Sequence, residues 1–122
     1  MRIRTALLAL TLGIAAGSSN AAVPDSGWTG QQFMQLCRQD RAGCELIINT
    51  SLLSMVQGAG SLGANERDIE GFLGCGIMDA DNQAIANAVI AQLTRAQNSN
   101  LLEKDYISAI HWAANLAYPC PN

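Results

Sequence analysis

Four cysteines constrain the fold of this chain more than any other feature. They are Cys37, Cys44, Cys75 and Cys120. An even number of cysteines in a small exported domain normally forms a set of disulfides. The last cysteine lies in the closing sequence LAYPCPN, between Pro119 and Pro121. Because a helix cannot continue through either proline, this cysteine follows a helix end and is well placed to anchor it.

The first 21 residues predict an export signal. Arg2 and Arg4 supply positive charge, residues 6–16 are apolar, and Ser19-Asn20-Ala21 offers small residues at a cleavage site. The apolar stretch is too short to span a bilayer, which needs about 20 residues. We therefore expect residues 1–21 to be a signal peptide and residues 22–122 to form a single domain that is not held in the membrane after cleavage.

Removal of the signal would leave an acidic chain. The full sequence has 7 basic and 10 acidic residues, which gives a net charge of −3. Loss of Arg2 and Arg4 leaves 5 basic residues against the same 10 acids, a net charge of −5. This charge disfavours nucleic acid and anionic lipid as partners, and it is compatible with a basic protein partner.

Hydrophobic periodicity predicts an all-α domain, a compact bundle of about four helices stapled by two disulfides. Thr29 with Gln32, and Asn100 with Glu103, match the capping box that opens a helix. No alternating pattern typical of strands competes with these helices. The expected helices run from Thr29 to Cys37, from about Cys44 to Val56, from Asp81 onward, and from Asn100 to just before Pro119.

The connection over residues 57–80 is long for a compact domain and is repeatedly interrupted by glycine. Connections of this length are usually functional or partly structured, so we expect a short helix near residues 67–72 in an otherwise mobile loop. On that helix Glu66 and Glu70 would project together, with Asp68 turned away. These three acids are candidate partner-binding residues for a basic cleft. The alternative is a solvated connection with no partner.

Four cysteines allow three pairings, and the sequence alone does not choose among them. Cys37 and Cys44 fall at one end of the first helical hairpin, and Cys75 and Cys120 fall at one end of the second. We favour Cys44–Cys75 with Cys37–Cys120. Each of these bridges would close a long loop between the hairpins, worth roughly 3–4 kcal/mol, whereas a Cys37–Cys44 bridge would join only neighbours across a turn.

The sequence motifs predict neither catalysis nor a cofactor. Residues 58–63 match the letters GxGxxG, but a predicted helix precedes them where a dinucleotide site requires a strand. Residues 79–90 begin like a calcium loop and lack its glycine and its final acid. His111 is the only histidine, and oxidised cysteines would leave it no thiolate partner. We therefore expect no enzyme activity, no metal and no cofactor.

Four segments carry a recognisable cysteine arrangement: TGQQFMQLC, AGCELII, GCGI and AANLAYPCP. Cys37 ends one helix, Cys44 opens the next, Cys75 precedes the third, and Tyr118-Pro119-Cys120 closes the last. This arrangement resembles the Rap/Tai family of periplasmic immunity proteins of type VI secretion systems, over essentially the whole chain after the signal. The sequence departs from the family where Glu45-Leu46 replaces a frequent glycine-aromatic pair, and where no proline follows the third cysteine closely.

The resemblance implies a mostly helical periplasmic protein, often a homodimer, that binds and blocks a toxic effector. In many members that effector is a peptidoglycan amidase. The partner of the present protein would thus be a cognate effector protein. The alternative is an acid-stress or general periplasmic chaperone, which would also be small, helical and disulfide-bonded. The acidic balance and the glycine-rich residues 57–66 are compatible with that alternative.

Overall fold

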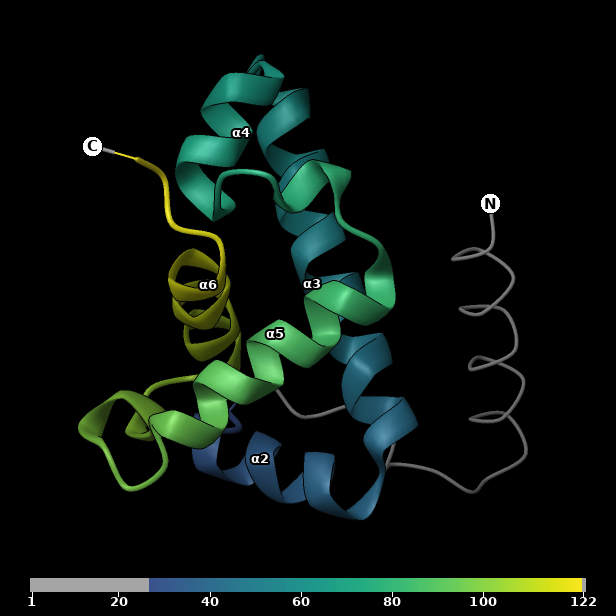
Figure 1. Cartoon of the computed structure of the whole chain (residues 1–122). Coiled ribbons are helices and arrows are strands. Elements are labelled where there is room, and N and C mark those ends of the chain that lie inside the picture. The colour runs from purple at the N-terminus through teal and green to yellow at the C-terminus, as the bar shows by residue number, and fades with distance from the viewer. Residues whose placement is uncertain (1–26, 122) are drawn as a thin grey trace.

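The computed structural model describes residues 27–121, and this range is all-α (Figure 1). The expected signal peptide and its cleavage site lie outside the described residues. The predicted compact helical fold with two disulfides is confirmed. The described helices are α2 (Gly30–Gln39), α3 (Arg41–Ser61), α4 (Glu66–Leu73), η1 (Ile77–Asp79), α5 (Asn82–Arg95), η2 (Asn100–Glu103) and α6 (Tyr106–Ala117), where η marks a 3₁₀ helix.

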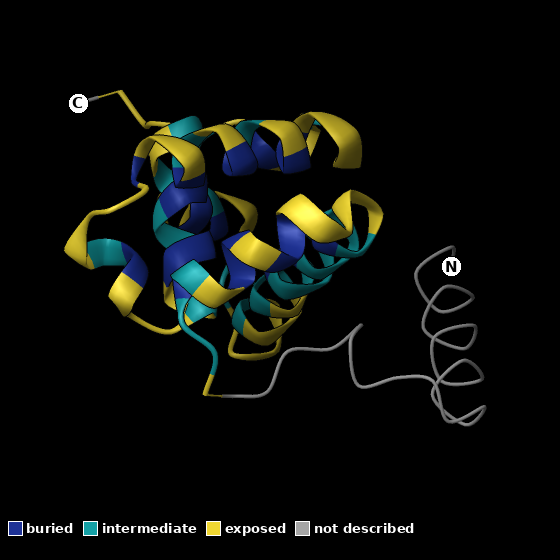
Figure 2. Cartoon of the chain, turned by 90° about the horizontal axis from the view of Figure 1, so that it is seen from below, coloured by how far each residue is buried: buried dark blue, intermediate teal, exposed yellow. Residues whose placement is uncertain are grey.

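The core lies where α2, α3, α5 and α6 meet, and Figure 2 shows the buried segments gathered where these helices pack together. Phe33, Ile48, Leu93 and Ile110 are completely buried there. Long α3 runs from α2 at one end of the molecule to α4 at the other (Figure 1). The helix α6 packs closely against its neighbours because much of its buried face is alanine: Ala109, Ala113 and Ala114.

The first and third expected helices begin where the sequence predicts. Thr29 Oγ1 accepts a hydrogen bond from the backbone N–H of Gln32 at 3.2 Å, and the Gln32 side chain accepts one from the Thr29 N–H at 2.8 Å. Asp81 caps α5 by accepting from the N–H of Ala84 at 2.7 Å. Each cap satisfies backbone donors that have no partner within the helix.

The expected start of the last helix at Asn100 is wrong. Residues Asn100–Glu103 form η2, and α6 begins at Tyr106 with Asp105 as its cap. The Asp105 carboxylate accepts from the N–H of Ser108 at 3.0 Å and from its hydroxyl at 2.7 Å. These hydrogen bonds, that from the Ser108 hydroxyl first, lower the pKa of Asp105.

Tertiary packing explains why residues 100–103 do not join α6. Leu102 in η2 is completely buried against the start of α2. A Cβ added to Gly30 would lie 3.0 Å from Leu102 and 3.2 Å from Ala109, so the contact leaves little room for a larger residue. The N–H of Gly30 also donates to the carbonyl oxygen of Lys104 at 2.8 Å. The packing of η2 against the start of α2 therefore determines where the chain turns before α6 begins.

The second helix is longer than expected at its C-terminal end, because Gly58 and Gly60 lie inside α3 rather than in a mobile loop. The helix ends in a Schellman motif, in which Ala64 N–H donates to the Ala59 carbonyl and Gly63 N–H donates to the Gly60 carbonyl, both at 3.0 Å. Gly63 takes the left-handed conformation that this motif requires, with φ +92°. The short helix expected near residues 67–72 is present as α4.

The disulfides join Cys37 to Cys44 and Cys75 to Cys120, so the favoured pairing of Cys44 with Cys75 and of Cys37 with Cys120 is wrong. The corner between α2 and α3 explains the first bridge. Only Asp40 separates these helices, and the Cα atoms of Cys37 and Cys44 lie 4.8 Å apart. Neither bridge joins the two expected hairpins, which therefore hold together by packing.

The second disulfide fixes the segment after α6. The Cα atoms of Cys75 and Cys120 lie 4.9 Å apart, and the N–H of Cys75 donates to the carbonyl oxygen of Tyr118 at 2.9 Å. Gly74 has φ +147°, and a Cβ there would lie only 2.7 Å from the Cβ of Tyr118, so only glycine fits. The predicted anchoring of Cys120 is thus realised against Cys75, at the end of α4, and not against the first helix.

Candidate partner-binding surface

The three candidate acids all lie on α4, but they differ in environment. Glu66 opens the helix and is exposed, whereas Glu70 is half-buried. Asp68 completes a capping box: its carboxylate accepts from the N–H of Asn65 at 3.2 Å, and its own N–H donates to the Asn65 side chain at 2.9 Å. Asp68 therefore has a structural role in addition to its charge.

Three interactions hold the C-terminal end of α4 against α6. His111 Nε2 donates to the carbonyl oxygen of Phe72 at 2.7 Å, and Asn115 donates to the same oxygen at 3.0 Å. The rings of Phe72 and His111 lie with their centroids 4.2 Å apart. The α4 carbonyl near the helix end would otherwise lack a partner. These contacts make α4 a fixed element, and they span at least 39 residues of sequence.

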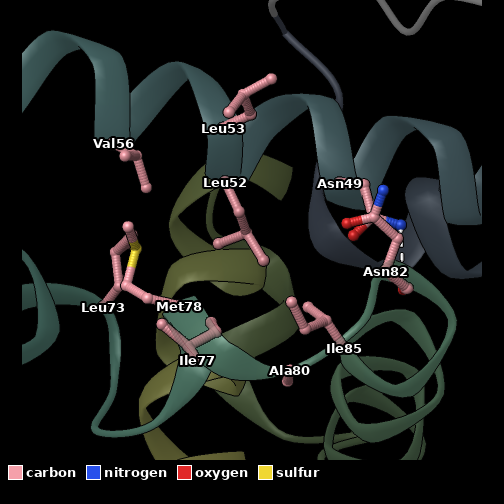
Figure 3. Close-up of a pocket in the computed structure, with 10 residues that line it drawn as sticks. All are labelled: Asn49, Leu52, Leu53, Val56, Leu73, Ile77, Met78, Ala80, Asn82 and Ile85. Carbon is pink, nitrogen blue, oxygen red and sulfur yellow. Dashed lines mark hydrogen bonds between the residues drawn. The ribbon is translucent and has the colours of Figure 1, made fainter. Parts of the chain in front are cut away.

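An apolar groove of about 190 Å³ lies between α3 and the segment from α4 to α5 (Figure 3). In Figure 3, Leu52 and Val56 point from α3 toward Leu73, Ile77 and Met78. Leu52, Leu73, Ile77 and Ile85 are buried and form its floor. The residues at its margin are partly or fully exposed: Asn49, Leu53, Val56, Met78, Ala80 and Asn82.

Polar groups close the groove at the end nearest α2. Asn49 donates to the carbonyl oxygen of Asn82 at 3.1 Å. One turn earlier, Glu45 accepts from Arg41 at 2.9 Å and from Gln83 at 3.0 Å, which ties the start of α3 to the start of α5. These hydrogen bonds, that from Gln83 first, lower the pKa of Glu45. The groove itself is lined by no charged side chain.

Charge is unevenly distributed over the described residues. Residues 42–94 carry six acids and only Arg67 as a base, while Arg41, the first residue of α3, and Arg95, the last residue of α5, border this segment. The remainder of the described range carries four basic and three acidic residues. All residues that line the groove belong to this acidic segment of the chain. The six acids are Glu45, Glu66, Asp68, Glu70, Asp79 and Asp81.

Sequence reasoning identified the acids of α4 and missed the groove. The missed residues have no shared sequence motif, because Val56 and Met78 are 22 positions apart and meet only through the tertiary fold. The sequence does contain one indication. No charged residue occurs between Glu45 and Glu66, although this stretch is too long and contains too many polar residues to be buried along its whole length. A stretch of apolar residues that the core does not bury can mark an interaction site.

Within residues 27–121, no cluster of three or more histidine, cysteine or acidic side chains is arranged to hold a metal ion. Nor does that range contain a helix with the length and apolarity needed to cross a membrane. The two disulfides indicate an oxidising environment of the kind that exported proteins meet.

Comparison with known proteins gave no match: no protein-family model fits this chain, and no curated protein or solved structure is significantly similar to it.

Proposed function

We propose that this chain is a periplasmic immunity protein of the Rap/Tai type, exported by a signal peptide over residues 1–21, which binds and neutralises a type VI secretion effector. A peptidoglycan-degrading amidase is the effector to test first. The observation that carries the proposal is the cysteine arrangement, with all four cysteines at helix ends and both pairs oxidised in a rigid helical domain. An inhibitor of this kind needs no chemistry of its own, only a fixed and complementary surface.

The acidic surface of α4 supports this proposal. Glu66 and Glu70 lie on a helix that Cys75 and the contacts of Phe72 hold in place, so partner binding would not have to order a flexible loop. A fixed binding element lowers the entropic cost of association. Acids on such an element would steer a basic enzyme cleft toward it. A homodimer remains part of the proposal, on the strength of the resemblance.

Co-expression tests the function directly. The protein is directed to the periplasm together with the product of a neighbouring effector-like gene, and growth is followed. Rescue of growth is expected if the proposal is right. Absence of any neighbouring effector or secretion gene, together with failure to rescue, would end it. Protection of unrelated proteins at low pH without a dedicated partner would instead identify a chaperone.

Charge reversal tests the role of α4 in that binding. The double variant Glu66→Lys and Glu70→Lys should slow association about tenfold at low salt and reduce its salt dependence, because exposed interface charges act mainly on the on-rate. Glu103→Lys serves as the control, since Glu103 is exposed and lies on η2 rather than on α4. Association as fast as that of the unmodified protein would exclude α4 as the docking element.

A further inference from the structure

We propose that the groove between α3 and the segment from α4 to α5 is a docking site for a single apolar side chain that a partner protein presents beside lysine or arginine residues. The groove has an apolar floor and is partly open to solvent. Its volume of about 190 Å³ is below the 300–1,000 Å³ typical of small-molecule pockets. A site of this size suits one side-chain anchor.

The margin of the groove indicates that its apolar residues serve binding. Met78 is 40% exposed, although it lies directly over a buried floor that includes Ile77. Methionine is flexible and polarizable, and it is frequent at binding surfaces that must adapt to a partner. Val56 and Leu53 on α3 are only half-buried. An apolar side chain of a partner, bound among these residues, would bury the apolar surface that they still expose to solvent.

The surrounding charges identify the partner as basic. Asp79 and Asp81 alternate with the margin residues Met78, Ala80 and Asn82, and both acids are exposed. Glu66 and Glu70 lie on α4, whose last residue, Leu73, forms part of the groove floor. An apolar centre with a charged rim is the usual anatomy of a protein interface. A cationic rim on the partner would complement this one.

The same charges argue against a second copy of this chain as the occupant. In a two-fold dimer the same patch faces itself, so a dimer built on the groove would bring the exposed Asp79 and Asp81 at its margin close to an identical pair. Repulsion between like charges opposes that arrangement. Anionic lipids and fatty acids meet the same repulsion at the groove.

This inference deepens the proposed function by naming the chemistry of the partner surface, and it can fail separately. If neutralisation of an effector is found but the groove binds no cationic apolar probe, the groove is not the docking site. If the probe binds while no effector is neutralised, the groove serves a different basic partner and the proposed function is wrong.

Three short capped peptides test the site on the oxidised mature protein. The first has one leucine between two pairs of lysines, the second replaces the leucine by serine, and the third replaces the lysines by glutamates. Binding is followed by NMR, which measures even millimolar affinities. The lysine–leucine peptide should shift the backbone amides of residues 53–56 and 77–80 and bind at least about tenfold more tightly than either control. Equal binding of the three peptides, or shifts elsewhere, would overturn the proposal.

Matched variants locate the site. Met78→Arg places a cation at the groove margin and should weaken binding of the lysine–leucine peptide at least about tenfold. Ile107→Arg adds the same charge on α6 at nearly the same exposure, 43% against 40%, and should leave binding within about twofold. Val56→Thr keeps the side-chain shape and charge and should weaken binding a few-fold through polarity alone. Equal effects of the two arginine variants would contradict the assignment.

Discussion

The two halves of α3 differ sharply, although one continuous helix contains both. The first half, residues 41–52, holds all the buried residues of the helix: Cys44, Ile48 and Leu52. None of residues 53–61 is fully buried: Met55, Val56 and Ala59 only flank the core, and this half packs beside α4 (Figure 1). Apolar residues occur in both halves. The difference teaches that the first half holds the fold together, whereas the second half presents a surface.

The largest expected effect lies in the first half. Ile48→Ala removes a completely buried side chain where α3 meets the core, and we expect a loss of about 3 kcal/mol in the free energy of unfolding, within the range found for such truncations. Val56→Ala is the matched truncation in the second half and should cost about 1 kcal/mol or less. Urea unfolding under oxidising conditions measures both. Equal losses would remove the distinction between the halves.

The next largest expected change in stability comes from the C-terminal end of α3. Gly63→Ala forces a residue with a Cβ into the left-handed conformation, at a cost of about 1–2 kcal/mol. There is open space for the new Cβ, so strain of the backbone is the whole effect. Unfolding in urea gives the change. A variant as stable as the unmodified protein would show that α3 does not end in this motif.

A smaller effect of opposite sign tests whether residues 57–61 are helical. Gly60→Ala should stabilise the protein by about 0.4–1 kcal/mol, because alanine costs less conformational entropy than glycine in a helix and its Cβ meets nothing within 4 Å. Gly58→Ala should behave in the same way. Thermal unfolding followed by circular dichroism gives the sign. No gain, or a loss, would indicate the mobile loop that the glycines suggest in the sequence.

The smallest expected effect is a pH dependence in the first half. Hydrogen bonds from Gln83 and then Arg41 lower the pKa of Glu45 below its ordinary value of 4.5. The resulting stability is present above about pH 4.5 and is lost as the pH falls through the lower folded-state value. Compared with Glu45→Gln, the unmodified protein should therefore be slightly more stable at pH 6 and lose this advantage toward pH 3. If the difference in stability between the two proteins did not change with pH, the Glu45 carboxylate would not contribute in this way.

The sequence predicted those parts of the fold that depend on local signals. The spacing of Thr29 and Gln32 predicts the first cap, the residue type predicts the cap at Asp81, and the short helix expected near residues 67–72 is α4. The start of α6 could not be found in this way. Asn100 and Glu103 have the right residues for a cap, but Leu102 between them packs under Gly30, a contact of the tertiary fold.

The length of α3 escaped prediction for a related reason. Glycine lowers helix propensity, so Gly58 and Gly60 favoured a loop, whereas the Schellman motif and the packing of α4 continue the helix to Ser61. Only the acids of the candidate surface could be read from the sequence. The groove needs Val56 of α3 and Met78 of η1 to line one hollow, and no local pattern encodes that arrangement.

The pairing of the cysteines has a consequence for how this chain matures. Each disulfide joins a cysteine to the next one along the chain, Cys37 to Cys44 and Cys75 to Cys120. When a chain enters an oxidising compartment with its N-terminus first, an oxidase that links cysteines in order of arrival produces this pattern directly. No isomerase is then required to correct it. The first bond can close before α4 has emerged, whereas the second must wait for all of α5 and α6.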